Sequence, residues 1–179
     1  MKKNVLKNGE KLVEKYFEQI QSLRDGNENS VDELMKLWNT DGVFEFSGSA
    51  PLIGTYKGEL AIRTLYNNRL KSNGMELKLH AGRKDFKSFN LGIVKTDISH
   101  VKTNDDKIIV GWKTTIGTKD GLGYDISGSH LFLVVNEKIK SLRVTISTKP
   151  EVSSLKELSM EELSIQDIGR LSLAAWPVV

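Results

Sequence analysis

The chain has 179 residues, of which 39% are hydrophobic and 27% charged, the composition of an ordinary globular protein. A chain of this length fits one domain with room for an appendage and can bury roughly 70% of its unfolded surface, so the core needs no cross-links. The absence of cysteine excludes disulfides, thiolate metal sites and thiol nucleophiles. The net charge is +3, and its 26 basic residues are interspersed with 23 acidic ones. Because nucleic-acid binders gather basic residues on one element, we expect no nucleic-acid partner.

Membrane insertion and secretion are also not expected. No apolar run approaches the ~20 residues that a membrane-spanning helix needs. The N-terminal Lys2 and Lys3 are followed by further polar residues, not by the apolar stretch of a secretion signal. The sequence therefore predicts a cytoplasmic protein with no membrane partner.

Three helices are predicted in the N-terminal part of the chain. Apolar residues recur at three- and four-residue spacing within 12–23, which marks the inner face of a first helix. Ser30 and Glu33 stand at capping-box spacing and predict the start of a second helix, whose inward face ends at Trp38. A third helix is expected to end before Gly74, a residue suited to a left-handed C-cap.

Strands dominate the remainder. A short strand is predicted at 43–46, between the second and third helices. From residue 75 the period of the pattern changes to two, and strands are predicted near 75–83, 88–103, 107–117, 122–135 and 138–147. Helices followed by antiparallel strands indicate an α+β fold, in which the helices cover one face of a curved sheet. Glycines inside the strand patterns, such as Gly128, are typical of bulges and bends in such a sheet.

The C-terminal segment departs from this pattern. Its leucines and isoleucines predict two short helices that end in an apolar tail around Trp176. We therefore expect a domain of residues 1–148 followed by a helical extension, 149–179. This extension is expected to cover the open sheet face, a pocket mouth or a partner subunit.

Alternation along the strands predicts which residues face the interior. Ile126, His130 and Phe132 share one side of their strand, and Trp112 belongs to the apolar side of the preceding strand. We expect both sides to face inward, opposite four aromatic residues, Tyr16, Trp38, Phe44 and Phe46. An aromatic lining with two polar groups, Tyr16 and His130, is the usual composition of a small-molecule site. The alternative is that these residues form a packed core, in which Tyr16 and His130 have satisfied hydrogen bonds.

Three segments carry a resemblance to a known family. They are the helix–strand passage 16–51, the turn that opens the third helix at 54–59, and the strand and turn 130–143. Together they resemble the cone-shaped fold shared by nuclear transport factor 2-like (NTF2-like) proteins, SnoaL-like polyketide cyclases and ketosteroid isomerases. The resemblance covers about 1–148 and implies a curved antiparallel sheet of five or six strands wrapped around three N-terminal helices. It also implies a pocket inside the cone, no cofactor, and a homodimer formed through the sheet.

The resemblance also suggests roles for individual residues. In ketosteroid isomerases a helix-one tyrosine and a strand aspartic acid form an oxyanion hole, and a second aspartate shuttles the proton. Tyr16 falls at the position of the tyrosine, His130 at the oxyanion aspartic acid and Phe46 at the proton-shuttling base. Phenylalanine cannot accept a proton, so isomerisation by the ketosteroid isomerase mechanism is not expected. Many SnoaL-like proteins carry a histidine or another polar group where this chain has His130.

Two function classes remain open from the sequence. In the first, the protein is a cofactor-free isomerase, cyclase or dehydratase in which Tyr16 and His130 polarise a carbonyl or exchange a proton. In the second, it is a non-catalytic ligand-binding or assembly module. A carboxylate from Asp97 or Asp125 directed into the cavity would favour catalysis. The three histidines stand apart in the sequence, so no metal site is expected.

Overall fold

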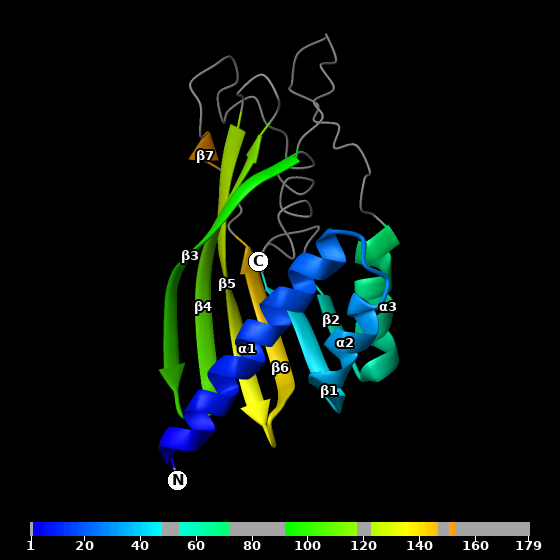
Figure 1. Cartoon of the computed structure of the whole chain (residues 1–179), viewed down its shortest axis with the longest axis vertical. Helices are drawn as coiled ribbons and strands as arrows, with labels where there is room; N and C mark the ends of the chain where they lie inside the picture. Colours follow the sequence, from blue (N-terminus) through cyan, green and yellow to red (C-terminus); the bar gives the residue numbers. More distant parts are fainter. Residues whose placement is uncertain (1, 48–53, 72–91, 118–122, 147–150, 153–179) are drawn as a thin grey trace.

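The computed structural model of the chain describes residues 2–47, 54–71, 92–117, 123–146 and 151–152. Its helices are α1 (Lys2–Arg24), α2 (Ser30–Lys36) and α3 (Glu59–Lys71). Its strands are β1 (Trp38–Ser47), β2 (Gly54–Lys57), β3 (Gly92–Asn104), β4 (Lys107–Gly117), β5 (Gly123–Val135), β6 (Lys138–Ile146) and β7 (Glu151–Val152). The helices lie on one side of a long, curved sheet (Figure 1).

The sheet has the strand order β2-β1-β6-β5-β4-β3, and β7 pairs with β5 beside this path. Strands β3 to β6 form consecutive antiparallel pairs, and β2 is antiparallel to β1. Strand β1, however, runs parallel to β6. The expectation of a wholly antiparallel sheet is therefore wrong at this pair, and the sheet is mixed. About half of the chain lies between the two strands, so no local turn chemistry predicts their direction.

Two local predictions around α2 are also wrong. Trp38 belongs to β1 and not to the second helix, and the pairing of β1 with β6 is irregular between Trp38 and Val43. Glycine is needed at position 42 within this irregular stretch, because a Cβ atom there would lie 2.6 Å from the Trp38 indole. The Ser30 hydroxyl donates to the Asn27 carbonyl and makes no capping box.

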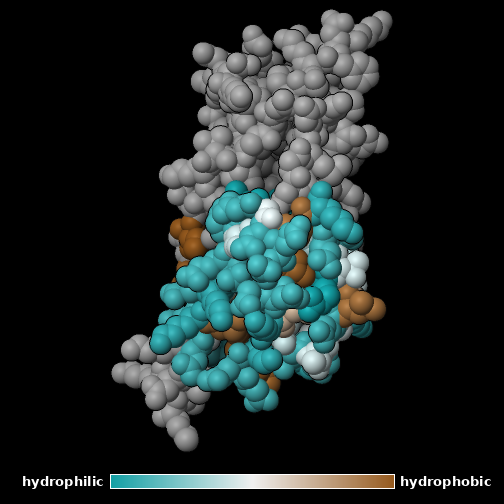
Figure 2. All heavy atoms as spheres, turned by 45° about the vertical axis from the view of Figure 1, so that its right-hand side comes forward, coloured by the Kyte–Doolittle hydropathy of each residue, from teal (hydrophilic) through white to brown (hydrophobic). Residues whose placement is uncertain are grey.

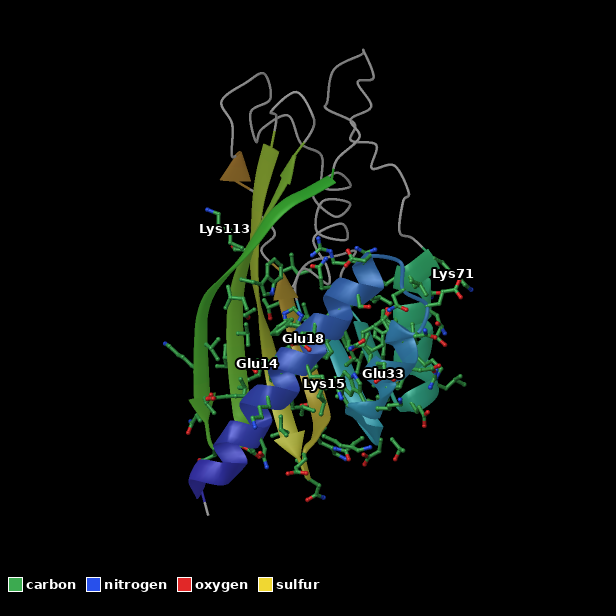
Figure 3. All side chains as sticks on the ribbon, in the orientation of Figure 1. Glu14, Lys15, Glu18, Glu33, Lys71 and Lys113 are labelled. Atoms are coloured by element: carbon green, nitrogen blue, oxygen red, sulfur yellow. The ribbon has the colours of Figure 1, made fainter. Side chains whose placement is uncertain are left out.

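The core lies between α1 and the inner face of the sheet. Helix α1 crosses that face diagonally (Figure 1), and its exposed side carries charged residues including Glu14, Lys15 and Glu18 (Figure 3). The face formed by the helices is mainly hydrophilic (Figure 2). On the sheet, Val110 pairs with His130 and Ile108 with Phe132, and all four side chains are buried. The prediction that both strand faces point inward is therefore confirmed for these residues.

Some expectations concern residues outside the described part of the chain. They are the strand predicted at 75–83, the end of the third helix before Gly74 and the two helices predicted within 149–179. Strand β7 falls inside that last range and pairs with Tyr124 and Asp125 of β5. No helix in the described ranges is long and apolar enough to span a membrane.

Candidate functional site

The predicted site residues whose side chains the structure describes lie in one buried cluster between the helices and the inner face of the sheet. There are seven of these residues, and each is at most 6% exposed: Tyr16, Trp38, Phe44, Phe46, Trp112, His130 and Phe132. The side chain of Ile126 lies outside the described part, although its backbone belongs to β5. The structure therefore brings the predicted residues together, and it places them in the hydrophobic core.

His130 occupies one end of this cluster and is completely buried. The indole Nε1–H of Trp112 donates a hydrogen bond to its Nδ1 atom at 2.8 Å. The imidazole stacks on Phe132 with ring centroids 6.0 Å apart, and the Phe17 ring approaches it edge-on at 5.2 Å. Its second nitrogen, Nε2, has no hydrogen-bond partner, and it is the one side-chain nitrogen or oxygen in this condition among the buried described residues. His130 thus has one satisfied nitrogen and one unused nitrogen in an apolar environment.

A chain of hydrogen bonds forms the other polar part of the cluster. The Tyr16 and Tyr66 hydroxyls lie 3.0 Å apart, and the Trp38 Nε1–H donates to the Tyr66 hydroxyl at 3.2 Å. The Tyr16 hydroxyl is therefore engaged by Tyr66, on α3. The rings of Tyr16 and His130 lie near one another, with centroids 6.3 Å apart. Tyr16 thus links the hydrogen-bonded chain to the surroundings of His130.

Burial sets the protonation states of these groups. Burial lowers the pKa of His130 to about 3, so the ring is neutral at physiological pH. Burial, and then the neighbouring Tyr66, raise the pKa of Tyr16 well above its ordinary value. The pKa of Tyr66 is also raised by burial, against the opposing effect of its two hydrogen bonds. Tyr16 and Tyr66 consequently remain protonated, and either hydroxyl can be the donor in the bond between them.

The position of the expected base is apolar. Phe46 packs edge-on against Phe44 with ring centroids 5.0 Å apart, on the inner face of β1. Among the described residues, the buried polar side chains are Ser30 and His130, and no carboxylate joins them. The described part of the cluster can therefore donate hydrogen bonds, but it has no carboxylate to accept a proton.

Two members of the cluster were not predicted as site residues. Phe17 and Tyr66 are buried, and each contacts a predicted residue. Both were visible in the sequence as apolar positions at helical spacing, which identifies a buried helix face and not a hydrogen-bond partner. The contact between the Tyr66 and Tyr16 hydroxyls depends on how α3 packs against α1, which the local pattern does not specify.

The hydrogen-bonded chain predicts an order of effects on stability. Tyr66→Phe should lower the free energy of unfolding by roughly 1–3 kcal/mol, because it leaves the buried Trp38 N–H without an acceptor. Tyr16→Phe should cost less, about 1 kcal/mol, because the bond between Trp38 and Tyr66 remains. Urea denaturation of both variants measures the two costs. An equal or larger loss for Tyr16→Phe would contradict the central position of Tyr66.

The described residues contain no group of three or more histidine, aspartate or glutamate side chains placed to hold a metal ion. In chemical terms, the described cluster is an apolar site that contains neutral hydrogen-bond donors. Its polar atoms are contributed by α1, α3, β1, β4 and β5.

Comparison with known proteins shows the fold. No family model and no curated protein matches the chain. Among solved structures, an NTF2-like protein from Burkholderia xenovorans matches with a TM-score of 0.53 and 15% identity, over 79% of this chain and 91% of the other. An LEH-like epoxide hydrolase from M. tuberculosis matches with a TM-score of 0.51 and 12% identity, over 95% of both chains. An NTF2-like protein of unknown function from Mesorhizobium loti matches with a TM-score of 0.51 and 15% identity, over 79% of this chain and 93% of the other. The chain therefore has the cone-shaped α+β fold of NTF2-like proteins.

Proposed function

We propose that this protein binds a small, largely apolar molecule that carries a carbonyl or a similar oxygen, inside the cone between α1 and the sheet. The observation that supports the proposal most strongly is the unpartnered Nε2 atom of His130 in a fully buried aromatic cluster. Buried polar atoms in native proteins are ordinarily hydrogen-bonded, because an unmade bond costs about 1–3 kcal/mol. A bound molecule that supplies an acceptor to Nε2 removes this cost.

Ligand binding fits the described residues better than proton transfer. Phe46 stands where ketosteroid isomerases carry their base, and it is packed against Phe44. A general base must reach the substrate proton at ~3 Å and have a suitable pKa. The described cluster has no carboxylate that meets the first condition, and the pKa of His130, about 3, fails the second.

A cofactor-free isomerase, cyclase or dehydratase is the second candidate. Two neutral donors on neighbouring rings, Tyr16 and His130, would polarise a bound carbonyl. One structural neighbour, from M. tuberculosis, is an epoxide hydrolase by name. This function also requires a base, and the candidates Asp97 and Asp125 have side chains outside the described part of the chain. Asp97→Asn and Asp125→Asn, each assayed for turnover and for binding, separate the two candidates.

Equilibrium dialysis tests the proposed binding. The protein is dialysed against a mixture of bicyclic aromatic ketones and the hydrocarbons of the same shape, and the retained compounds are quantified by mass spectrometry. We expect the wild-type protein to retain ketones in preference to hydrocarbons and His130→Phe to lose this preference. Phenylalanine fills most of the space of the imidazole but offers no N–H donor. No retention of any compound by folded wild-type protein would contradict the proposal.

We also propose a homodimer formed through the outer face of the sheet. A shallow cavity of about 310 Å³ lies on this face, lined by Val43, Glu45, Lys107, Leu131, Leu133, Ser141, Leu142 and Arg143. Ile109 is 37% exposed and pairs with Leu131 on the same face. Apolar groups on an open sheet face are typical of a surface that a partner covers.

Sedimentation velocity tests the dimer. Leu131→Asp places a charge in the middle of the outer face, so it should convert a dimeric wild-type protein into a monomer. Leu60→Asp is the matched control, because Leu60 is 79% exposed on α3, away from the sheet face, and should leave the oligomeric state unchanged. A monomeric wild-type protein, or a Leu131→Asp variant that remains dimeric, would rule out this interface.

A further inference from the structure

The hydrogen bond between Trp112 and His130 determines where the proton of the imidazole lies. An indole nitrogen can only donate, so the Nδ1 atom that receives its N–H must present a lone pair. In the neutral ring the proton is then on Nε2. The nitrogen that has no partner in the protein is therefore an N–H donor.

We propose that Trp112 is a positioning residue that fixes His130 as a hydrogen-bond donor, so that the ligand of this site presents an acceptor oxygen to Nε2–H. The inference rests on the proposed function for the existence of a ligand, and it specifies the ligand's chemistry. A ketone, ether or epoxide oxygen satisfies Nε2–H. The corresponding hydrocarbon leaves Nε2–H without an acceptor. A group that can only donate hydrogen bonds would place a second donor against it.

The pairing of β4 with β5 brings the Trp112 indole close to the His130 imidazole. Trp112 on β4 pairs with Gly128 on β5, and His130 lies two residues further along the same face of β5. The indole occupies the space that a side chain at Gly128 would fill, because a Cβ there would lie 2.4 Å from the indole Cζ2 atom. The indole therefore lies across β5 and reaches the imidazole diagonally. A Cβ atom at position 128 would also lie 2.3 Å from the backbone oxygen of Thr145, so only glycine fits here.

No charged group among the described contacts of His130 opposes this assignment. From α1, the Tyr16 and Phe17 rings face the imidazole, and Tyr16 is the one titratable group in these ring contacts. On the sheet, His130 pairs with two valines, Val110 and Val144. Burial lowers the pKa of His130, which keeps the ring neutral, and a second ring proton on Nδ1 would meet the Trp112 N–H. His130 therefore acts as a donor that polarises an oxygen and does not remove a proton from the ligand.

Nitrogen NMR of protein labelled with ¹⁵N-histidine tests the tautomer without any ligand. His130 is identified by its missing signals in His130→Phe, and long-range correlations at neutral pH distinguish protonated from unprotonated ring nitrogens. We expect a single Nε2–H tautomer in the wild-type protein and a mixture of tautomers in Trp112→Phe. Trp38→Phe is the matched control, since it removes a buried indole that donates to Tyr66, and it should leave the His130 tautomer unchanged.

Two results would overturn the assignment: an Nδ1–H tautomer in the wild-type protein, or a Trp112→Phe protein that keeps the pure Nε2–H form. If Trp112→Phe does not fold, the wild-type spectrum decides alone.

A pair of probes tests the ligand chemistry. 2-Acetylnaphthalene carries an acceptor oxygen where 2-isopropenylnaphthalene carries a methylene group of similar size. We expect the wild-type protein to bind the ketone about tenfold more tightly, a difference that corresponds to about 1.4 kcal/mol, and His130→Phe to bind both equally. Equal affinities in the wild-type protein would overturn the inference. Binding of neither probe would count against the proposed function and leave the tautomer result standing, so the two failures are distinguishable.

Discussion

Lowering the pH from 6.5 towards 3 should destabilise this protein by up to roughly 4–5 kcal/mol through His130 alone. Burial lowers the pKa of His130 from its ordinary value of 6.5 to about 3. Below pH 6.5 the unfolded chain therefore carries a proton on this histidine, while the folded protein does not. Because the unfolded state binds more protons, the free energy of unfolding falls as the pH falls. The slope approaches about 1.4 kcal/mol per pH unit, and it ends near pH 3, where the folded protein also takes up the proton.

Urea denaturation at several pH values between 7.5 and 5 measures this effect. Two carboxylates in the described part have a lowered pKa, Glu33 beside Lys36 and Asp41 beside Lys140. Their ordinary values are 4.5 and 3.8, so their effect on stability falls below this pH range. The wild-type protein and His130→Phe are compared, so that the difference isolates this histidine from the other two. We expect stability to decline more steeply with falling pH in the wild-type protein. Parallel curves would show that His130 titrates in the folded state as it does in the unfolded chain.

Gly128→Ala should lower the free energy of unfolding by about 3 kcal/mol, the upper part of the usual range for overpacking a core. The added Cβ would lie 2.3 Å from the Thr145 carbonyl oxygen and 2.4 Å from the Trp112 indole. The first of these atoms belongs to the backbone of β6, so it cannot move without distorting the pairing of β5 with β6. Displacing the indole would in addition break its hydrogen bond to His130. The substitution should therefore reduce both stability and the purity of the His130 tautomer.

Gly54→Ala is the matched control for this substitution. It also lies in a strand, but its Cβ would meet the Tyr56 ring at 3.5 Å or more, which is ordinary van der Waals contact. We expect a change within about 1 kcal/mol in either direction. Thermal and chemical denaturation of both variants provide the comparison. Equal stabilities of the two variants would mean that Gly128 is not packed as described.

The strands that follow the helices were predictable because their signals are local. The predicted strand 107–117 matches β4, and the predicted ranges 122–135 and 138–147 differ from β5 and β6 by one residue at one end. The turn before β4 and the turn between β5 and β6 contain residues tolerant of the left-handed conformation, and Asp105 and Asn136 both have a φ of 52°. Alternation then placed Trp112 and His130 on the inner face.

The failures arise where distant parts of the chain decide the outcome. Trp38 continues the apolar spacing of α2, yet it begins β1, because β1 pairs with a strand about 100 residues later. Gly128 was predicted from its type as a site of a bulge or bend, and no sequence pattern indicated that its small size also accommodates the Trp112 indole. The bond from Trp112 to His130 requires both the register of β4 with β5 and a diagonal side-chain direction, and a sequence pattern specifies only the face. The same limit applies to the contact of Tyr66 with Tyr16.

A high-resolution crystal structure of the protein with 2-acetylnaphthalene would show directly which atom Nε2 of His130 contacts. We expect the ketone oxygen about 3 Å from Nε2, with the Trp112 indole still donating to Nδ1. A ketone bound elsewhere, with Nε2 donating to an oxygen of the protein itself, would contradict it. His130 would then be a satisfied core residue, and the proposed site would not exist.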